Sequence, residues 1–203
     1  MASAAAPGES GNLLLPVLPL RELCLFPAAS LAVVVTSPGA LRALDIAQRT
    51  GGRVLAVAQR EGAPSARDLH ELGTVAHVAE DTPVPEGGRR VELDGERRGR
   101  ALAVLGVDAL VAEVALLEEG DPGDGWGAAV EALARYLHAH AELRSFLDQQ
   151  RRSPEPMSWV NLACQHLPIT ATARQRLLES AAPERCLRIS RGMDALLRKE
   201  QGA

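Results

Sequence analysis

The chain contains a single lysine, and this scarcity excludes several classes of enzyme. Lysine and arginine together number 22 of the 203 residues, and only Lys199 is a lysine. A P-loop needs a Gly-Lys-Ser/Thr sequence, whereas Lys199 lies between Arg198 and Glu200 near the end of the chain. A Ser-Lys hydrolase needs a buried lysine with a lowered pKa, which such a position does not offer. A P-loop ATPase is therefore excluded, and lysine-based catalysis is not expected.

Cysteine and aromatic residues are also scarce. The three cysteines, Cys24, Cys164 and Cys186, are odd in number and widely spaced, which fits neither a disulfide framework nor paired zinc ligands. We therefore expect a reducing compartment, no metal and no cofactor. Aromatic residues make up 2% of the chain. Few aromatic side chains are thus present on which bases can stack, and nucleic acid is not an expected partner.

No hydrophobic run is long enough to cross a membrane. The longest run, Leu13 to Leu20, contains two prolines and ends at Arg21, far short of the roughly 20 apolar residues of a membrane helix. No positive charge precedes this run, as a secretory signal requires. The sequence therefore predicts a cytoplasmic protein with no membrane partner.

Short apolar runs separated by turn residues predict a β-rich domain over residues 13–118, after a disordered leader over residues 1–12. In the clearest run, Val91 and Leu93 share one face of a strand and polar residues share the other. Gly-Gly and Asp-Gly pairs bracket this run as turn signals. Seven such runs predict a closed or partly closed sheet, a pseudo-barrel: residues 13–20, 31–36, 53–59, 74–79, 90–93, 100–105 and 109–117.

One early helix is expected among these strands. Ser37 is its predicted N-cap, Pro38 its first residue and Gly51-Gly52 its end. Leu41 and Leu44 lie at helical spacing between these signals.

A segment rich in helix and strand breakers, residues 119–125, is the predicted linker to a helical bundle over residues 126–203. Apolar spacing predicts one helix from Trp126 to about Gln150 and three shorter helices after it, with Ser153 as a candidate cap. The formal charge is −7 through Gly125 and +3 beyond it. The predicted fold class is α+β, a β-rich pseudo-barrel with one early helix followed by a helical bundle.

A distinctive run begins the β-rich part: Leu18-Pro19-Leu20-Arg21-Glu22-Leu23-Cys24-Leu25-Phe26-Pro27. Related runs follow in order at residues 41–44, 57–61, 71–75 and 91–100. Together they resemble the N-terminal substrate-binding domain of the Lon protease family, and residues 166–169 and 176–179 resemble that family's helical bundle. The resemblance implies a stand-alone substrate-binding module without the family's ATPase and protease domains. It also implies structural roles for Pro19, Leu20, Arg21, Pro27, Gly73, Gly95 and Arg98.

Leu23, Leu25 and Phe26 are the candidate peptide-binding residues. An aromatic residue before Pro27, in a loop between strands, is either a plug in the core or an exposed anchor, and the sequence leaves both open. If exposed, the three side chains form an apolar patch of the kind that binds proteins.

Several arginines are candidates for an anion-binding site. For Arg21 the sequence favours a structural ion pair or hydrogen bond over contact with a ligand. Acidic residues lie among the later arginines, which favours ion pairing across strands over an anionic-ligand patch. These later arginines are Arg89, Arg90, Arg97, Arg98 and Arg100.

The leading functional hypothesis is a non-enzymatic module that captures unfolded or extended polypeptide segments. An unpaired strand edge would bind the segment through backbone hydrogen bonds, and apolar loop residues would contact its side chains. The alternative is an adaptor or assembly factor whose arginine-bearing helical part docks on a separate protease or ATPase. A small-molecule-binding domain or hydrolase is a third hypothesis, for which no acid, base or nucleophile cluster is evident.

Overall fold

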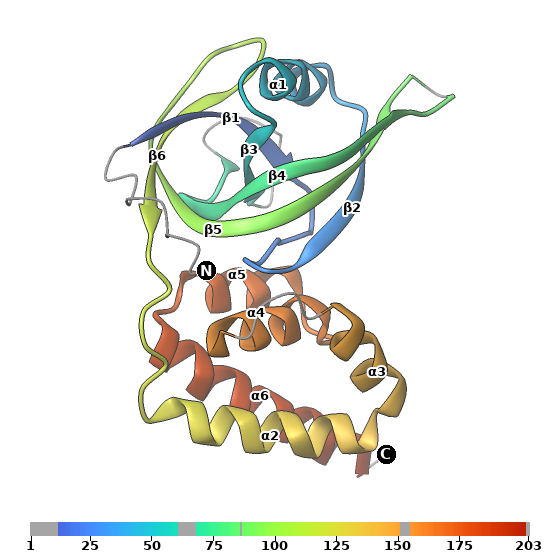
Figure 1. The fold of residues 1–203 in the computed structure, drawn as a ribbon, viewed down its shortest axis with the longest axis vertical. Coiled ribbons are helices and arrows are strands. Elements are labelled where there is room, and N and C mark those ends of the chain that lie inside the picture. The colour runs from blue at the N-terminus through green and yellow to red at the C-terminus, as the bar shows by residue number, and fades with distance from the viewer. Residues whose placement is uncertain (1–11, 61–67, 86, 151–154, 202–203) are drawn as a thin grey trace, which may run out of the picture.

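The computed structural model describes residues 12–60, 68–85, 87–150 and 155–201, and it shows a β-barrel stacked on a layer of helices (Figure 1). The predicted leader lies outside these residues except for Asn12. The barrel part comprises β1 (Leu13–Leu20), β2 (Ser30–Val35), α1 (Pro38–Arg49), β3 (Arg53–Ala58), β4 (Leu72–Pro83), β5 (Arg89–Leu105) and β6 (Val111–Leu117). The helical part comprises α2 (Gly125–Ala139), α3 (Ala141–Gln150), α4 (Pro156–His166), α5 (Ala171–Glu179) and α6 (Ala182–Gln201). The predicted α+β fold class is confirmed.

The barrel closes because β5 is long enough to pair with three other strands. The strand order is β2-β5-β4-β3-β1-β6, and β6 pairs again with β5. β1 and β3 are parallel, and the other pairs are antiparallel. Register shifts within the β4–β5 and β5–β6 ladders are irregularities of the kind that bend and twist a strand. In the described residues β2 pairs only with β5, so one edge of β2 is left without a strand partner.

Two of the seven predicted strands, residues 90–93 and 100–105, are one continuous strand, β5. The predicted turn at Asp94-Gly95 is wrong, because both residues lie within the paired ladder. Gly95 serves a different purpose, since a Cβ at this position would lie 2.2 Å from the carbonyl oxygen of Phe26. The glycine therefore marks a close approach of two backbone segments, a common reason for glycine inside a strand.

The early helix, α1, follows its sequence signals. The Ser37 hydroxyl accepts a hydrogen bond from the Ala40 N–H, and Pro38 is the first helical residue, where its missing N–H costs nothing. Gly51 and Gly52 follow the helix with positive φ angles of 94° and 74°. α1 covers the end of the barrel opposite the helical layer (Figure 1).

The helix predicted over residues 126–150 is two helices, α2 and α3. His140 ends α2 with φ −127° and ψ 70°, and its backbone N–H donates to the Leu137 carbonyl. The apolar spacing from Trp126 to Leu147 continues across the break, so spacing alone could not reveal it. The candidate cap at Ser153 lies outside the described residues.

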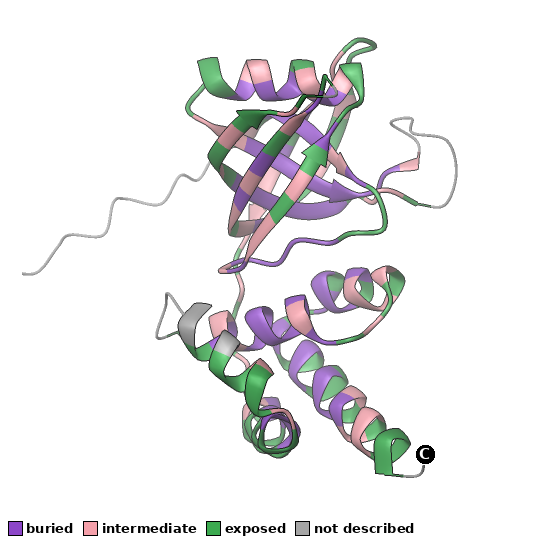
Figure 2. Ribbon diagram, turned by 90° about the vertical axis from the view of Figure 1, so that its right-hand side faces the viewer, coloured by how far each residue is buried: buried purple, intermediate pink, exposed green. Residues whose placement is uncertain are grey.

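The barrel and the helices share one hydrophobic core. The loop after β1 lies between them, and its residues Cys24, Leu25, Phe26 and Pro27 are all buried. Figure 2 shows this loop as a purple stretch between the barrel and the helices. A second apolar cluster, which includes Val17, Leu55 and Val114, packs separately between strands of the barrel.

Candidate functional site

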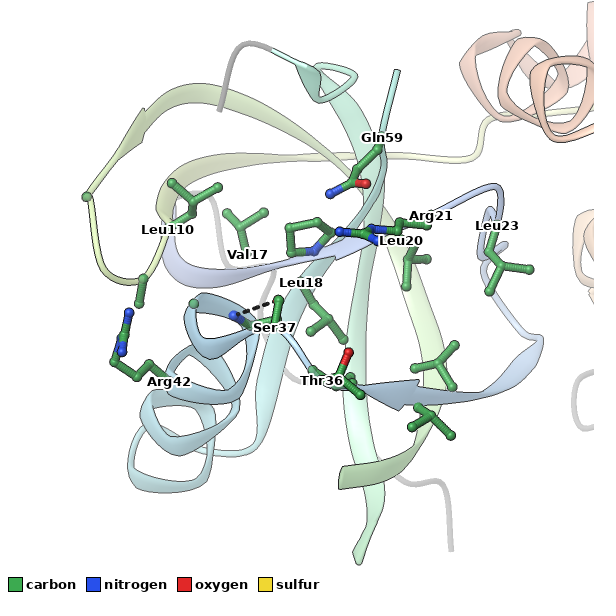
Figure 3. Close-up of a pocket in the computed structure, with 18 of the residues that line it drawn as sticks. Val17, Leu18, Leu20, Arg21, Leu23, Thr36, Ser37, Arg42, Gln59 and Leu110 are labelled. Carbon is green, nitrogen blue, oxygen red and sulfur yellow. Dashed lines mark hydrogen bonds between the residues drawn. The ribbon is translucent and has the colours of Figure 1, made fainter. Parts of the chain in front are cut away.

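A groove with a volume of about 770 Å³ opens on the side of the barrel between β1 and β2. Arg42 and Leu110 lie at one end of it and Leu23 lies at the other (Figure 3). Residues 17–21, 32–37 and 106–110 contribute most of its lining. The groove therefore runs beside the edge of β2 that has no strand partner among the described residues.

The free edge of β2 presents the backbone of Ala32 and Val34. The Ala29 carbonyl accepts a hydrogen bond from the Gly95 N–H of β5, so the backbone of Ala29 faces β5. Backbone direction alternates along a strand, and the β2–β5 register continues without a shift to Val35. Ala32 and Val34 therefore point their N–H and C=O groups away from β5, towards the unpaired edge.

The opposite wall of the groove is β1, and Pro19 limits what it can pair with. The Leu20 carbonyl accepts from the Gln59 N–H on the β3 side, so alternation turns the backbone of Pro19 the other way. Pro19 has no N–H to donate. This side of β1 thus offers a carbonyl but no donor at Pro19, and β2 is the better edge for adding a strand.

The groove is lined largely by apolar side chains, and several of them are exposed. Leu23 is 36% exposed, Val34 61% and Val107 99%. Exposed apolar side chains along one groove are a feature of protein-binding surfaces. A free strand edge beside them supplies both backbone hydrogen bonds and apolar contacts to an extended segment.

Three charged residues line the groove. The Arg42 Nε donates to the Asp108 carbonyl oxygen at 2.9 Å, and its guanidinium lies 3.6 Å from the Asp108 carboxylate. Arg21 is exposed and has neither ion pair nor side-chain hydrogen bond in the described part of the chain. Neither the structural ion pair nor the side-chain hydrogen bond expected for Arg21 is therefore found among these residues, and its side chain lines the groove (Figure 3).

Two of the three predicted peptide-binding residues are buried. Leu25 is 1% exposed and Phe26 0%, so the exposed-anchor alternative is wrong for both. Their loop is fixed from two sides: the Phe26 N–H donates to Gln165 Oε1 of α4 at 3.0 Å, and Thr74 Oγ1 of β4 donates to the Leu25 carbonyl at 2.6 Å. The Leu25 and Phe26 side chains pack in the core between the barrel and the helices. Of the three predicted residues, only Leu23 lines the groove.

Most of the motif residues lie away from the groove. Pro27 is buried, and Gly73 allows a close approach, because a Cβ there would lie 2.3 Å from the Ala56 carbonyl oxygen. Pro19, Leu20 and Arg21 line the groove, although Leu20 is itself buried. Arg98 belongs to the contact between the barrel and the helices.

Arg98 and Arg185 join the two parts of the molecule through Glu119. The Arg98 Nε lies 3.1 Å and the Arg185 Nη1 2.7 Å from the Glu119 carboxylate. Both guanidinium groups also donate to the Ser180 carbonyl, and Arg185 is fully buried. The predicted linker is thus anchored at Glu119, which was not evident because its two partners lie 21 and 66 residues away along the chain.

Three of the five arginines of β5, Arg89, Arg97 and Arg98, form the predicted ion pairs, whereas Arg90 and Arg100 form none in the described part of the chain. Arg89 pairs with Asp81 of β4 and with Asp45 of α1. Hydrogen bonds to Asp81 and Asp45 raise the pKa of Arg89 despite partial burial. Arg97 pairs with Glu118. The acidic partners differ from those that are adjacent in sequence, and these paired arginines form no open anion site.

The cysteines are buried and carry poorly ionised thiols. Burial raises the pKa of Cys24 to about 12, and it also raises the pKa values of Cys164 and Cys186. A thiol must ionise to act as a nucleophile or metal ligand. In the described residues no group of three His, Cys, Asp or Glu side chains is placed to hold a metal ion, and no helix has the length and apolar character needed to cross a membrane.

Sequence reasoning missed two components of the groove. Val34 carried a signal, because it belongs to an uncharged, β-branched run at the edge of the sheet. Val107 and Asp108 follow Gly106, whose φ is 105°, in the loop between β5 and β6. Their position in the groove depends on barrel closure, which local patterns do not encode.

Comparison with known families gives one match that spans most of the chain. The family described as the ATP-dependent protease La (LON) substrate-binding domain matches residues 14–193. A Lon protease of Xanthomonas oryzae pv. oryzae is 31% identical in an alignment of 183 residues that covers 81% of this chain and 21% of that protein. A Lon protease of Brevibacillus choshinensis is 30% identical in an alignment of 186 residues that covers 85% of this chain and 23% of that protein. The chain thus spans between a fifth and a quarter of the length of these relatives.

Solved structures show the same fold. The N-terminal domain of the Mycobacterium avium complex Lon protease aligns with a TM-score of 0.73 at 21% identity, covering 90% of this chain and 98% of that one. A Lon N-terminal domain protein from Xanthomonas campestris aligns with a TM-score of 0.62 at 21% identity, covering 92% and 98%. The barrel and the helical bundle are therefore found together in other proteins.

Proposed function

Because the chain belongs to the family of LON substrate-binding domains, we propose that its groove binds an extended polypeptide segment by adding a strand to β2. The observation that supports this proposal is the free edge of β2, which lies beside exposed apolar side chains in a groove of about 770 Å³. Membership of this family supports a substrate-binding module. Among the described residues, the groove is the candidate site for the bound segment.

Backbone hydrogen bonds would position the segment. Ala32 and Val34 each present one N–H and one C=O to the open edge, so a bound strand gains up to four ladder hydrogen bonds from these two residues. Each such bond contributes about 0.5–1.5 kcal/mol net, since water competes for the same groups. Backbone pairing reads no side chain, which makes the binding tolerant of sequence.

Apolar contacts would select unfolded segments over folded ones. Leu23, Val34 and Val107 are exposed in the groove, and covering them removes apolar surface from water at about 25 cal/mol per Å². In a folded protein both the apolar side chains and the strand backbone are already satisfied. A segment can therefore enter the groove only when it has lost its own fold.

A proline at position 34 tests the strand-addition step. Val34→Pro removes the N–H that faces the open edge but no N–H of the β2–β5 ladder, and proline is tolerated at edge positions of this kind. Val34→Ala is the matched control, because it shortens the same side chain and keeps the N–H. Binding of end-capped ten-residue peptides of valine, alanine and serine, carrying a neutral fluorophore, is measured by fluorescence anisotropy.

We expect Val34→Pro to weaken peptide binding at least tenfold and Val34→Ala only two- to threefold, with unchanged circular dichroism in both. Equal binding by the wild type and Val34→Pro would overturn strand addition at β2. Failure of every peptide, and of a reduced and alkylated unfolded protein, to bind with a Kd below about 1 mM would overturn the proposed function as a whole.

The adaptor alternative has weaker support. Many charges of the helices are paired within the helical part: Arg135 with Asp194 and Arg188 with Glu184. Arg135 and Arg188 are therefore already engaged and are not free contacts for an acidic partner. The groove therefore remains the better-supported site.

A further inference from the structure

We infer that the groove prefers segments with an aspartate or glutamate next to their apolar residues, and that Arg21 binds this carboxylate. The inference rests on the proposed function, because it adds a charge preference to the segment that the groove would hold. It starts from the charged residues that line the groove.

Only one of these charges is without a counter-ion in the described residues. Arg42 and Asp108 neutralise each other at one end of the groove, through a 2.9 Å hydrogen bond to the Asp108 carbonyl and a 3.6 Å approach to its carboxylate. Arg21 has no such partner and lies along the β1 side. The lining thus carries one uncompensated positive charge.

The residue after Arg21 has an unusual backbone conformation. Glu22 has a φ of 53°, in the left-handed region that non-glycine residues seldom adopt. Arg21 and Leu23 line the groove on either side of it, whereas Glu22 does not. Arg21 and Leu23 thus contribute a cation and an apolar side chain to the lining, and the adjacent Glu22 is not part of it.

An arginine at the rim of an apolar groove suits a carboxylate. Its planar guanidinium can donate two parallel hydrogen bonds to both carboxylate oxygens. The net charge of the chain is −4, so long-range attraction does not favour an acidic segment. The preference must therefore come from local contact with Arg21, and salt must weaken it.

Matched peptides test this preference. The end-capped valine, alanine and serine peptides described above are compared with versions in which one serine is replaced by aspartate, by asparagine or by lysine, scanned over the serine positions. Binding is measured with the wild type, with Arg21→Gln and Arg21→Glu, and with Arg100→Gln as a control. Arg100 is likewise exposed, but it lies on β5 outside the groove lining.

At one aspartate position we expect about threefold to fivefold tighter binding than for asparagine, the size of an exposed ion pair. Arg21→Gln should abolish this ratio, Arg21→Glu should favour the lysine peptide, and Arg100→Gln should change nothing. An asparagine peptide that binds as well as the best aspartate peptide would overturn the charge inference and leave strand addition intact. Loss of all peptide binding by the wild type would overturn both, while an aspartate preference that persists in Arg21→Gln would overturn only the role of Arg21.

Discussion

The barrel has two contrasting surfaces, the end covered by the helices and the groove between β1 and β2. At the covered end, buried polar side chains satisfy the backbone: Thr74 donates to the Leu25 carbonyl and Gln165 accepts from the Phe26 N–H. At the groove, Ala32 and Val34 leave their outward backbone groups to water. The same barrel therefore closes one surface with side-chain hydrogen bonds and keeps a strand edge available on another.

The contrast explains why apolar residues in a single loop have different roles. Leu25 and Phe26 are directed into the shared core, where each is at most 1% exposed, whereas Leu23 is 36% exposed. The left-handed backbone at Glu22 and the positive φ of 65° at Ala28 lie at the two ends of this loop. Apolar character alone does not identify a binding residue, since both surfaces use it.

The largest expected effect on the free energy of unfolding comes from replacing Arg185 at the covered end. This fully buried guanidinium donates to Asn161, Glu119 and several carbonyls of the helices. Arg185→Met removes these donors, and we expect a loss of about 3–5 kcal/mol in the free energy of unfolding, as for other broken buried ion pairs. Urea unfolding measures it.

Arg188→Met is the matched control for Arg185→Met. Arg188 lies on the same helix and pairs with Glu184 in water, so its substitution should cost less than about 0.5 kcal/mol. If the two variants unfold at the same urea concentration, the Glu119 network does not hold the covered end together.

The next comparison separates a plug from a binding residue. Phe26→Ala should lower the free energy of unfolding by about 3–4 kcal/mol, because it leaves a cavity in the shared core. Leu23→Ala should cost under about 1 kcal/mol, since its side chain is partly exposed, yet weaken peptide binding several-fold. Thermal unfolding and peptide anisotropy measured on both variants check this. A stable Phe26→Ala variant that has lost peptide binding would reverse the assignment.

Sequence patterns predicted the elements of the barrel better than its surfaces. Capping at Ser37 and Pro38, and the run from Leu13 to Leu20, placed α1 and β1 correctly because their signals are local. The Asp94-Gly95 pair was wrongly predicted as a turn. The glycine is needed because the Phe26 carbonyl leaves no room for a Cβ, and this contact joins segments about 70 residues apart. Long-range contacts of this kind have no local signature.

The groove was predictable only in part. A free strand edge and a contribution from Leu23 were expected, but the strand that carries the edge was not. The sequence around Arg21, an apolar run before it and Glu22 after it, favours a structural ion pair or hydrogen bond. Glu22 has a left-handed backbone conformation and does not line the groove, which adjacency in sequence does not reveal.

A smaller effect tests the close approach at the covered end. Gly95→Ala places a methyl group 2.2 Å from the Phe26 carbonyl oxygen, so β5 and the loop must separate. We expect a loss of about 1–3 kcal/mol, as for other overpacked sites. Gly127→Ala in α2 is the control, because a Cβ there meets nothing within 4 Å, and alanine is the better helix former. Differential scanning calorimetry should show lowered and slightly raised Tm values, respectively, and equal Tm values would contradict the close approach.

The smallest expected effect is the pH dependence contributed by His166, at the end of α4 beside the covered end. Burial, and then the positive charge of Arg174, lower its pKa below the ordinary value of 6.5. The folded state therefore binds fewer protons than the unfolded state once the pH falls below about 6.5, and stability decreases in that direction. His166→Gln keeps a polar group and removes the titration. Urea unfolding between pH 7 and pH 5 should show a shallower loss of stability for His166→Gln than for the wild type, because the other four histidines are common to both. An identical slope would mean that His166 is as readily protonated in the folded chain as in the unfolded one, and the covered end would then be more open to water than its packing indicates.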